Sequence, residues 1–198
     1  MELILIRHGK PTHTKNVDGT PADPPLSNIG EKQALKVKDK LSSFGVNKIY
    51  SSTLKRAKQT ATPLAECSKL PLNLSEHLVE FDHLFQEYVP METLKKQNYQ
   101  KWLAYMQGDV EGVDFEKFSQ KVIAAIEDII KENKGQKVAI FCHGGVINMW
   151  MAHVMQAKPK LYFAPHYTSI NRFAASQKGH RTVLSLNDVN HLDGLASE

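Results

Sequence analysis

Two apolar runs, one at the start of the chain and one shortly after residue 135, limit its possible folds more than any other feature. Residues 3–6 read Leu-Ile-Leu-Ile and stop at Arg7-His8-Gly9, and residues 138–142 stop at His143-Gly144-Gly145. The first run has no polar alternation, which is typical of a strand covered on both faces in a parallel sheet. Since open α/β sheets place ligands at the carboxyl ends of their strands, we expect both histidines to lie at a site.

The rest of the sequence alternates between helix and strand patterns. Apolar residues recur at helical spacing at about residues 28–45, 53–64, 115–134 and 146–155, and Asp114 is the expected N-cap of the third of these helices. Short strands are predicted at residues 46–50, 70–74, 168–174 and 181–186. Pro63 is expected to kink or re-start the second helix. This order predicts an α/β fold, a three-layer sandwich with a mostly parallel central sheet and helices on both faces.

Residues 81–112 fit this pattern least well. They are rich in aromatic side chains, among them Tyr88 and Trp102, and show no strand period. We expect helices laid over the sheet here, within one domain that spans residues 1–198. We interpret the segment at about residues 81–112 as a cap or insert that covers the site and sets specificity. Ordinary core packing explains about half of its rings equally well.

Composition and charge exclude several classes of function. The formal net charge of +4 is mild and forms no dense basic block, so we expect an anionic small molecule and no nucleic acid as partner. No apolar run is long enough to span a bilayer, so no membrane is expected. Cys67 and Cys142 are isolated, which favours reduced thiols in a cytoplasmic protein. No zinc-binding or ATP-binding motif is present, and the oligomeric state is left open.

Four short motifs in a fixed order point to a family. They are Arg7-His8-Gly9, Arg56 within residues 51–61, Glu80 in Leu-Val-Glu, and His143-Gly144-Gly145. Their order and residue types resemble the histidine phosphatase superfamily, the phosphoglycerate-mutase-like proteins, and the resemblance runs from about the first residue to about the last. It implies a phosphoglycerate-mutase-like sandwich that needs neither a metal nor a cofactor.

Phosphoryl transfer explains why these residue types are needed. Charge spreads over the phosphoryl oxygens during transfer, and arginine forks such as those of Arg7 and Arg56 can hold these oxygens with paired hydrogen bonds. The resemblance implies that His8 is the nucleophile, forming a phosphohistidine, and that His143 donates to a phosphate oxygen beside the backbone N–H of Gly144. It also implies that Glu80 protonates the leaving alkoxide.

Some positions leave alternatives open. Asp82 and Glu76 rival Glu80 as the proton donor. Lys10 stands where many family members carry an acidic residue or glutamine, and Asn16 lies slightly beyond the usual asparagine, so both are candidate substrate contacts. We expect a metal-independent phosphomonoester hydrolase that acts on a phosphorylated small molecule. A phosphoglycerate-type mutase is the first alternative, and a non-catalytic phosphate-binding or scaffold protein is the second.

Overall fold

A computed structural model describes residues 1–195, and its central six-stranded sheet has the strand order β4-β3-β6-β1-β7-β8. β1 (Glu2–Arg7) lies inside the sheet and pairs in parallel with β6 (Lys137–Cys142). β3 (Lys48–Ser52) and β4 (Leu72–Ser75) continue this parallel half. The register places Arg7 opposite Cys142, so the residues that follow each of these two strands are neighbours.

The other half of the sheet is antiparallel. β7 (Ile170–Ala175) runs antiparallel to β1, and β8 (Arg181–Asp188) runs antiparallel to β7. The prediction of a mostly parallel α/β sheet is therefore confirmed, and the strand reversed against its neighbours is β7 alone. The predicted strands and helices differ from the observed ones mainly by a few residues at their ends.

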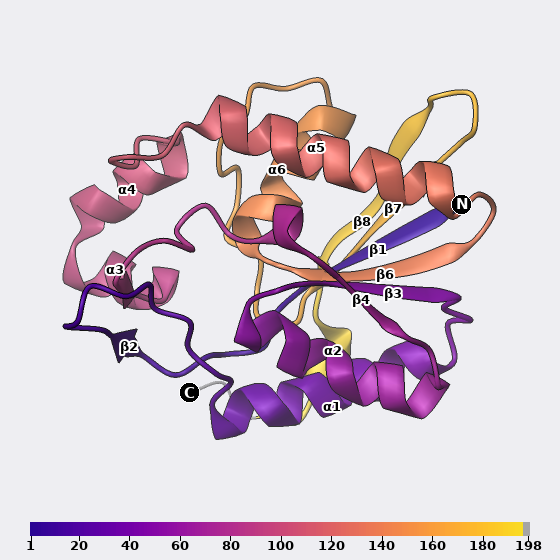
Figure 1. The fold of residues 1–198 in the computed structure, drawn as a ribbon, viewed down its shortest axis with the longest axis horizontal. Helices are drawn as coiled ribbons and strands as arrows, with labels where there is room; N and C mark the ends of the chain where they lie inside the picture. Colours follow the sequence, from indigo (N-terminus) through magenta and orange to yellow (C-terminus); the bar gives the residue numbers. More distant parts are fainter. Residues whose placement is uncertain (196–198) are drawn as a thin grey trace.

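Helices cover both faces of the sheet, which gives the three layers seen in Figure 1. α1 (Asn28–Ser42) and α2 (Lys55–Ser68) cover one face, and α5 (Phe115–Glu132) and α6 (Gly144–Val154) cover the other. β1 supplies both cores because its side chains alternate: Ile4 packs with the α1 and α2 side, and Leu5 with the α5 and α6 side.

The helix boundaries follow from capping residues that the sequence contains. The Ser27 hydroxyl accepts the N–H of Gly30 at the start of α1, and Asp114 Oδ1 accepts the N–H of Lys117 at 2.9 Å at the start of α5, as predicted. Of the two predictions for Pro63, the re-start is wrong, because α2 continues through it, and the kink stays a prediction. The N–H that proline lacks costs one hydrogen bond, while α2 keeps its buried face against the sheet.

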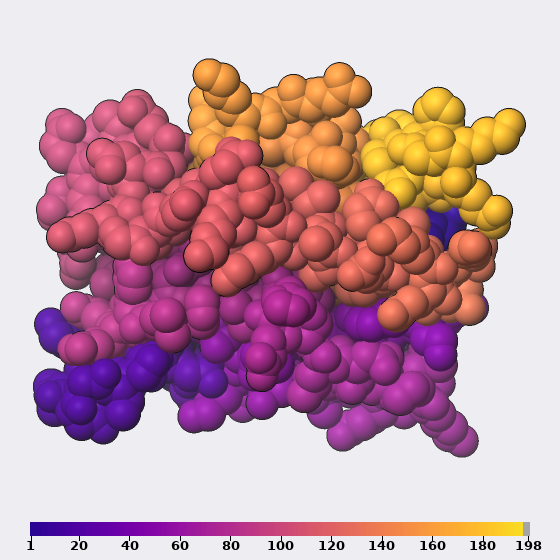
Figure 2. Space-filling model, turned by 45° about the horizontal axis from the view of Figure 1, so that its top comes forward, coloured from indigo at the N-terminus to yellow at the C-terminus, as the bar shows by residue number. Residues whose placement is uncertain are grey.

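The remaining elements gather at one end of the molecule. β2 (Thr14–Lys15) pairs with β5 (Glu87–Tyr88), and α3 (Met91–Gln97) and α4 (Tyr99–Gln107) follow. Figure 1 places α3 and α4 beyond the carboxyl end of β1. The expectation that these helices lie over a face of the sheet is therefore wrong. Figure 2 shows the indigo loop after β1 and the pink α4 region at this same end. Two 3₁₀ turns complete the described elements, Glu76–Leu78 and Asn190–Leu192.

No helix within residues 1–195 combines the length and the apolar character needed to cross a membrane.

Candidate active site

The two predicted strand ends meet in the structure. His8 follows β1 and His143 follows β6, and their ring centroids are 5.1 Å apart. Both rings are buried, together with Arg7 at the end of β1 and Arg56 in the first turn of α2. The parallel pairing of β1 with β6 therefore brings together Arg7, His8 and His143, and the pairing of β3 with β6 adds Arg56 from the helix that follows β3.

The hydrogen bonds of His8 fix which ring nitrogen carries the proton. Nδ1 lies 2.8 Å from the carbonyl oxygen of Gly9, which can only accept, so Nδ1 donates and Nε2 keeps its lone pair. The Arg56 Nε–H donates to His8 Nε2 at 3.2 Å. Burial, and then the charges of Arg56 and Arg7, hold the pKa of His8 well below its usual range. His8 is therefore a neutral imidazole with an available nucleophilic nitrogen.

The loop that carries His8 is held by close backbone contacts. The N–H of Gly9 donates to Thr60 Oγ1 in α2 at 2.9 Å. A Cβ on Gly9 would lie 2.7 Å from the Gly30 oxygen, and a Cβ on Gly30 would lie 2.1 Å from the Lys10 oxygen. The loop therefore crosses the first turn of α1 at a distance that only glycines permit, and this crossing fixes the position of His8.

Each buried arginine lies against a tyrosine ring. The Arg7 guanidinium carbon is 4.1 Å from the centroid of Tyr167, and that of Arg56 is 4.7 Å from the centroid of Tyr88. Arg7 also donates from Nη1 to the carbonyl oxygen of Pro165. Sequence reasoning missed Tyr167 as a site residue and treated Tyr88 only as a cap aromatic. Neither belongs to a strand-end motif, so only the tertiary structure reveals these contacts.

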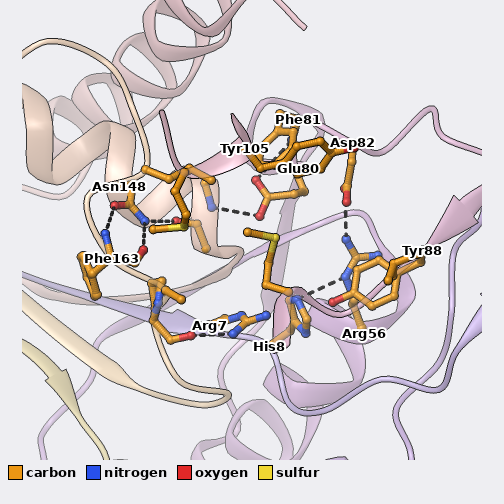
Figure 3. Close-up of a pocket in the computed structure, with 18 residues that line it drawn as sticks. Arg7, His8, Arg56, Glu80, Phe81, Asp82, Tyr88, Tyr105, Asn148 and Phe163 are labelled. Carbon is orange, nitrogen blue, oxygen red and sulfur yellow. Dashed lines mark hydrogen bonds and ion pairs between the residues drawn. The ribbon is translucent and has the colours of Figure 1, made fainter. Parts of the chain in front are cut away.

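Glu80 lies across the cavity from His8 (Figure 3). Its Oε2 accepts the N–H of Gly145 at 2.9 Å, and its Oε1 accepts the N–H of Phe81 at 3.2 Å. Burial, and then the charge of neighbouring Asp82, raise the pKa of Glu80 to about 7. Such a carboxyl can both release and take up a proton near neutral pH.

The two rivals of Glu80 lie in different places. Asp82 lines the same cavity, and its Oδ1 is 3.9 Å from Arg56 Nη2. Glu76 is exposed in a 3₁₀ turn and does not line the cavity. Two candidate carboxyl groups, those of Glu80 and Asp82, therefore line the same cavity as the arginines. Asp82 is the one that pairs with Arg56.

His143 is completely buried at the N-cap position of α6. Its Nε2 lies 2.8 Å from Ser52 Oγ, and that hydroxyl already accepts the N–H of Leu54. The other ring nitrogen, Nδ1, is a buried atom that has no hydrogen-bond partner among the described residues. Burial, and then Arg56, lower the pKa of His143 well below its usual range, so the ring is neutral.

The cavity above His8 has a volume of about 60 Å³. Of the predicted site residues, Arg7, His8, Arg56, Glu80 and Gly144 line it, whereas His143 lies buried behind its wall and does not.

Two predicted substrate contacts lie elsewhere. Lys10 lines an adjoining cavity on the other side of Arg7. The amide of Asn16 donates to the carbonyl oxygens of Thr20 and Pro21, so it stabilises its own loop.

Within residues 1–195, no three His, Cys, Asp or Glu side chains lie close enough together to hold a metal ion.

Fold and site together define an α/β protein with two histidines at adjacent strand ends, beside two buried arginines. The sequence profile of the histidine phosphatase superfamily (branch 1) matches residues 3–189, so the chain belongs to this family. The family predicted from the four motifs is thereby confirmed.

Similar proteins carry several names. "Phosphoglycerate mutase-like protein 4" of Arabidopsis thaliana is 29% identical, over 97% of this chain and 87% of its own. "Metal-independent phosphoserine phosphatase" of the same plant is 29% identical, over 79% of this chain and 69% of its own. The crystal structure of phosphoserine phosphatase from Entamoeba histolytica in complex with 3-phosphoglyceric acid is 27% identical, with a TM-score of 0.75, over 96% of this chain and 98% of that one.

Proposed function

We propose that the protein is a metal-independent phosphomonoester hydrolase that works through a phosphohistidine on His8. The observation that carries the proposal is the unprotonated Nε2 of His8, which accepts a hydrogen bond from Arg56 at one side of a cavity whose other side holds Glu80. Names of similar proteins support hydrolysis, since two of those described above are phosphoserine phosphatases.

The first chemical step transfers the phosphoryl group to the enzyme. His8 Nε2 attacks phosphorus, the bond from phosphorus to the ester oxygen breaks, and the alcohol leaves with a proton from Glu80. Arg7 and Arg56 stabilise the charge on the phosphoryl oxygens. His143 Nδ1–H and the N–H of Gly144 at the start of α6 donate to the same oxygens. Two imidazoles that are both neutral can divide these roles, one as nucleophile and one as donor.

The second step returns the enzyme to its starting state. Glu80, now a carboxylate, takes a proton from water as the water oxygen attacks phosphorus. The bond from phosphorus to Nε2 breaks, and inorganic phosphate leaves. We assign this acid and base role to Glu80 because two backbone N–H groups orient its carboxyl, whereas Asp82 faces Arg56.

A mutase is the second candidate, because one similar protein bears a mutase-like name. A mutase must hold a bisphosphate, whose second phosphoryl group needs a second set of cations. Among the described residues, the cavity that contains Glu80 offers only Arg7 and Arg56 as permanent cations, which favours hydrolysis. A coupled isomerisation assay with and without bisphosphoglycerate separates the two activities.

The test of the proposed function is hydrolysis of p-nitrophenyl phosphate in excess EDTA. We expect turnover by the wild type and a loss of about 10³-fold or more in His8→Ala, because the covalent route is closed. Rapid quenching is expected to trap a phosphoryl adduct that is stable in alkali and labile in acid, as a phosphoramidate is.

The matched control is His180→Ala, which removes an exposed histidine far along the chain in the turn between β7 and β8. It is expected to keep wild-type activity. An inactive wild type, or full activity and an adduct in His8→Ala, would contradict the proposed function.

Two further proposals accompany this one. We propose that residues 81–112 form the cap of the site, since Phe81, Tyr88 and Tyr105 line the cavity (Figure 3). We also propose a cytoplasmic location, because Cys67 and Cys142 are both unpaired, which suits a reducing compartment.

A further inference from the structure

The cavity above His8 has two chemically different ends. The end at the strand tips carries Arg7, His8, Arg56 and Glu80. The walls that extend away from it come from α3, α4, their flanking residues and the segment after α6, and they are largely apolar. The apolar residues on these walls are Phe81, Val89, Met91, Met106, Leu161 and Phe163.

The amide of Asn148, which interrupts the apolar wall, is fully used by the protein. Its Nδ2 donates to the carbonyl oxygens of Gly144 at 2.8 Å and Phe163 at 3.0 Å. Its Oδ1 accepts the N–H groups of Tyr162 at 2.7 Å and Phe163 at 3.2 Å (Figure 3). Both donors and both lone pairs are therefore occupied, and Asn148 has no hydrogen bond left for a ligand.

The charges lining this cavity are equally one-sided. Among the described lining residues, the permanent cations are Arg7 and Arg56, and both lie at the phosphate end. The carboxyl groups of Glu80 and Asp82 face the same space. A carboxylate on the alcohol part of a substrate would be placed against apolar walls and near two acidic groups, with no cation left to pair with it.

We propose that the substrates of this site are phosphomonoesters of uncharged, largely apolar alcohols, whose hydrocarbon part contacts the Met106 and Phe163 walls. This inference rests on the proposed hydrolase function and adds the class of alcohol to it. This class of substrate differs from phosphoserine and 3-phosphoglyceric acid, the compounds named for similar proteins. Both of those compounds carry a charged group beside the phosphate.

The adjoining cavity is the competing location for the alcohol. Lys10 and Lys95 line it, and it shares a wall of Arg7, Met91 and Pro165 with the cavity above His8. A substrate whose alcohol extended to that side would meet cations, so the two locations predict opposite preferences.

The test compares release of inorganic phosphate from benzyl phosphate, phosphoserine and 3-phosphoglycerate. All three are esters of aliphatic alcohols, so differences in leaving-group activation are small. We expect kcat/KM to be about 10²-fold higher for benzyl phosphate, because the benzyl ring is buried favourably and a carboxylate is not.

A charge placed on the apolar wall provides a second, independent measurement. Met106→Lys adds an ammonium at a half-buried position of α4 and is expected to lower the ratio of benzyl phosphate to 3-phosphoglycerate activity about tenfold. If Met106→Lys fails to fold, Val89→Lys places an ammonium on the same cavity from the residue that follows β5. It is expected to lower the same activity ratio. The matched control is Met155→Lys, at a residue that is 61% exposed and does not line the cavity, and its ratio should equal that of the wild type.

The outcomes are distinguishable. Hydrolysis of none of the three esters would overturn the proposed function itself. A second outcome is hydrolysis that depends on His8, with kcat/KM for 3-phosphoglycerate equal to or higher than that for benzyl phosphate. That outcome would overturn only the inferred class of alcohol. If that preference were then lost in Lys10→Ala or Lys95→Ala, the alcohol would belong in the adjoining cavity.

Discussion

At the scale of single residues, Glu80 combines two opposing influences. Backbone N–H groups of Phe81 and Gly145 favour its charged form, whereas burial and Asp82 favour its neutral form and raise its pKa to about 7. A carboxyl that is half protonated near neutrality has the property that an acid in one step and a base in the next requires.

This pKa predicts the shape of the pH profile. Only protonated Glu80 can donate to the leaving alkoxide, so kcat/KM for an alkyl phosphate should fall above pH 7, by about tenfold per pH unit. The nucleophile sets no limit on this basic side, because burial and the charges of Arg56 and Arg7 hold the pKa of His8 well below its usual range. The measurement is kcat/KM for benzyl phosphate from pH 5 to 9.

Glu80→Gln is the control for this assignment. It should remove the basic limb and slow alkyl phosphate hydrolysis by about 10²-fold to 10³-fold. p-Nitrophenyl phosphate should be affected less, since its leaving group needs little proton transfer. A basic limb that survives in Glu80→Gln would belong to another group, of which Asp82 is the nearest candidate.

At the scale of elements, the crossing of the β1 loop over α1 depends on Gly30. Alanine normally favours a helix over glycine, yet a Cβ here would meet the Lys10 oxygen at 2.1 Å. We expect Gly30→Ala to lower the free energy of unfolding by about 1–3 kcal/mol, because backbone must move to relieve the overlap. Urea unfolding followed by circular dichroism measures this change.

Lys36→Ala makes a matched comparison at an exposed position of the same helix and is expected to change stability by less than about 0.5 kcal/mol. Equal stability of Gly30→Ala and the wild type would show that the crossing is looser than the structure indicates.

The residues at the strand ends were predictable from the sequence. The residues that surround them in the cavity were not. An apolar run followed by Arg7-His8-Gly9 specifies both a buried strand and the place of its functional residues, since the sheet dictates where strand ends meet. Tyr167 and Tyr88 come from a loop and a two-residue strand, where no periodicity marks a residue for the site. Leu161 and Phe163 form the apolar wall from a segment without regular structure, for the same reason. Asn16 looked like a ligand by its position, but its own loop uses its amide.

At the scale of the whole molecule, one contact joins α3, part of the proposed cap, to the loop before β7 beside Arg7. The Tyr167 hydroxyl donates to Glu92 Oε1 on α3 at 3.0 Å, while the Tyr167 ring lies over Arg7. The backbone N–H of Thr168, the next residue, donates to the carbonyl oxygen of His8 at 3.3 Å. Tyr167 therefore connects the position of α3 to both the nucleophile and the arginine.

Tyr167→Phe tests this connection, because it keeps the ring and removes the hydroxyl. We expect KM for benzyl phosphate to rise about threefold to tenfold with kcat changed less, since a lost hydrogen bond of about 1 kcal/mol loosens the cap but leaves the arginine covered. Steady-state kinetics separates the two constants. Glu92→Gln keeps an acceptor for the hydroxyl and should resemble the wild type. A fall in kcat with KM unchanged would instead assign the Tyr167 hydroxyl to the chemical step.

The division of the cavity between sheet and cap has an evolutionary consequence. In the proposed mechanism the groups that handle phosphate come mainly from β1, α2 and the β6–α6 junction, while the surface proposed to contact the alcohol comes from residues 81–112 and from the segment after α6. Substitutions in these two segments should therefore exchange the accepted alcohol without disturbing the reactive groups. A lineage built this way can diversify its metabolic targets by altering two short stretches of chain.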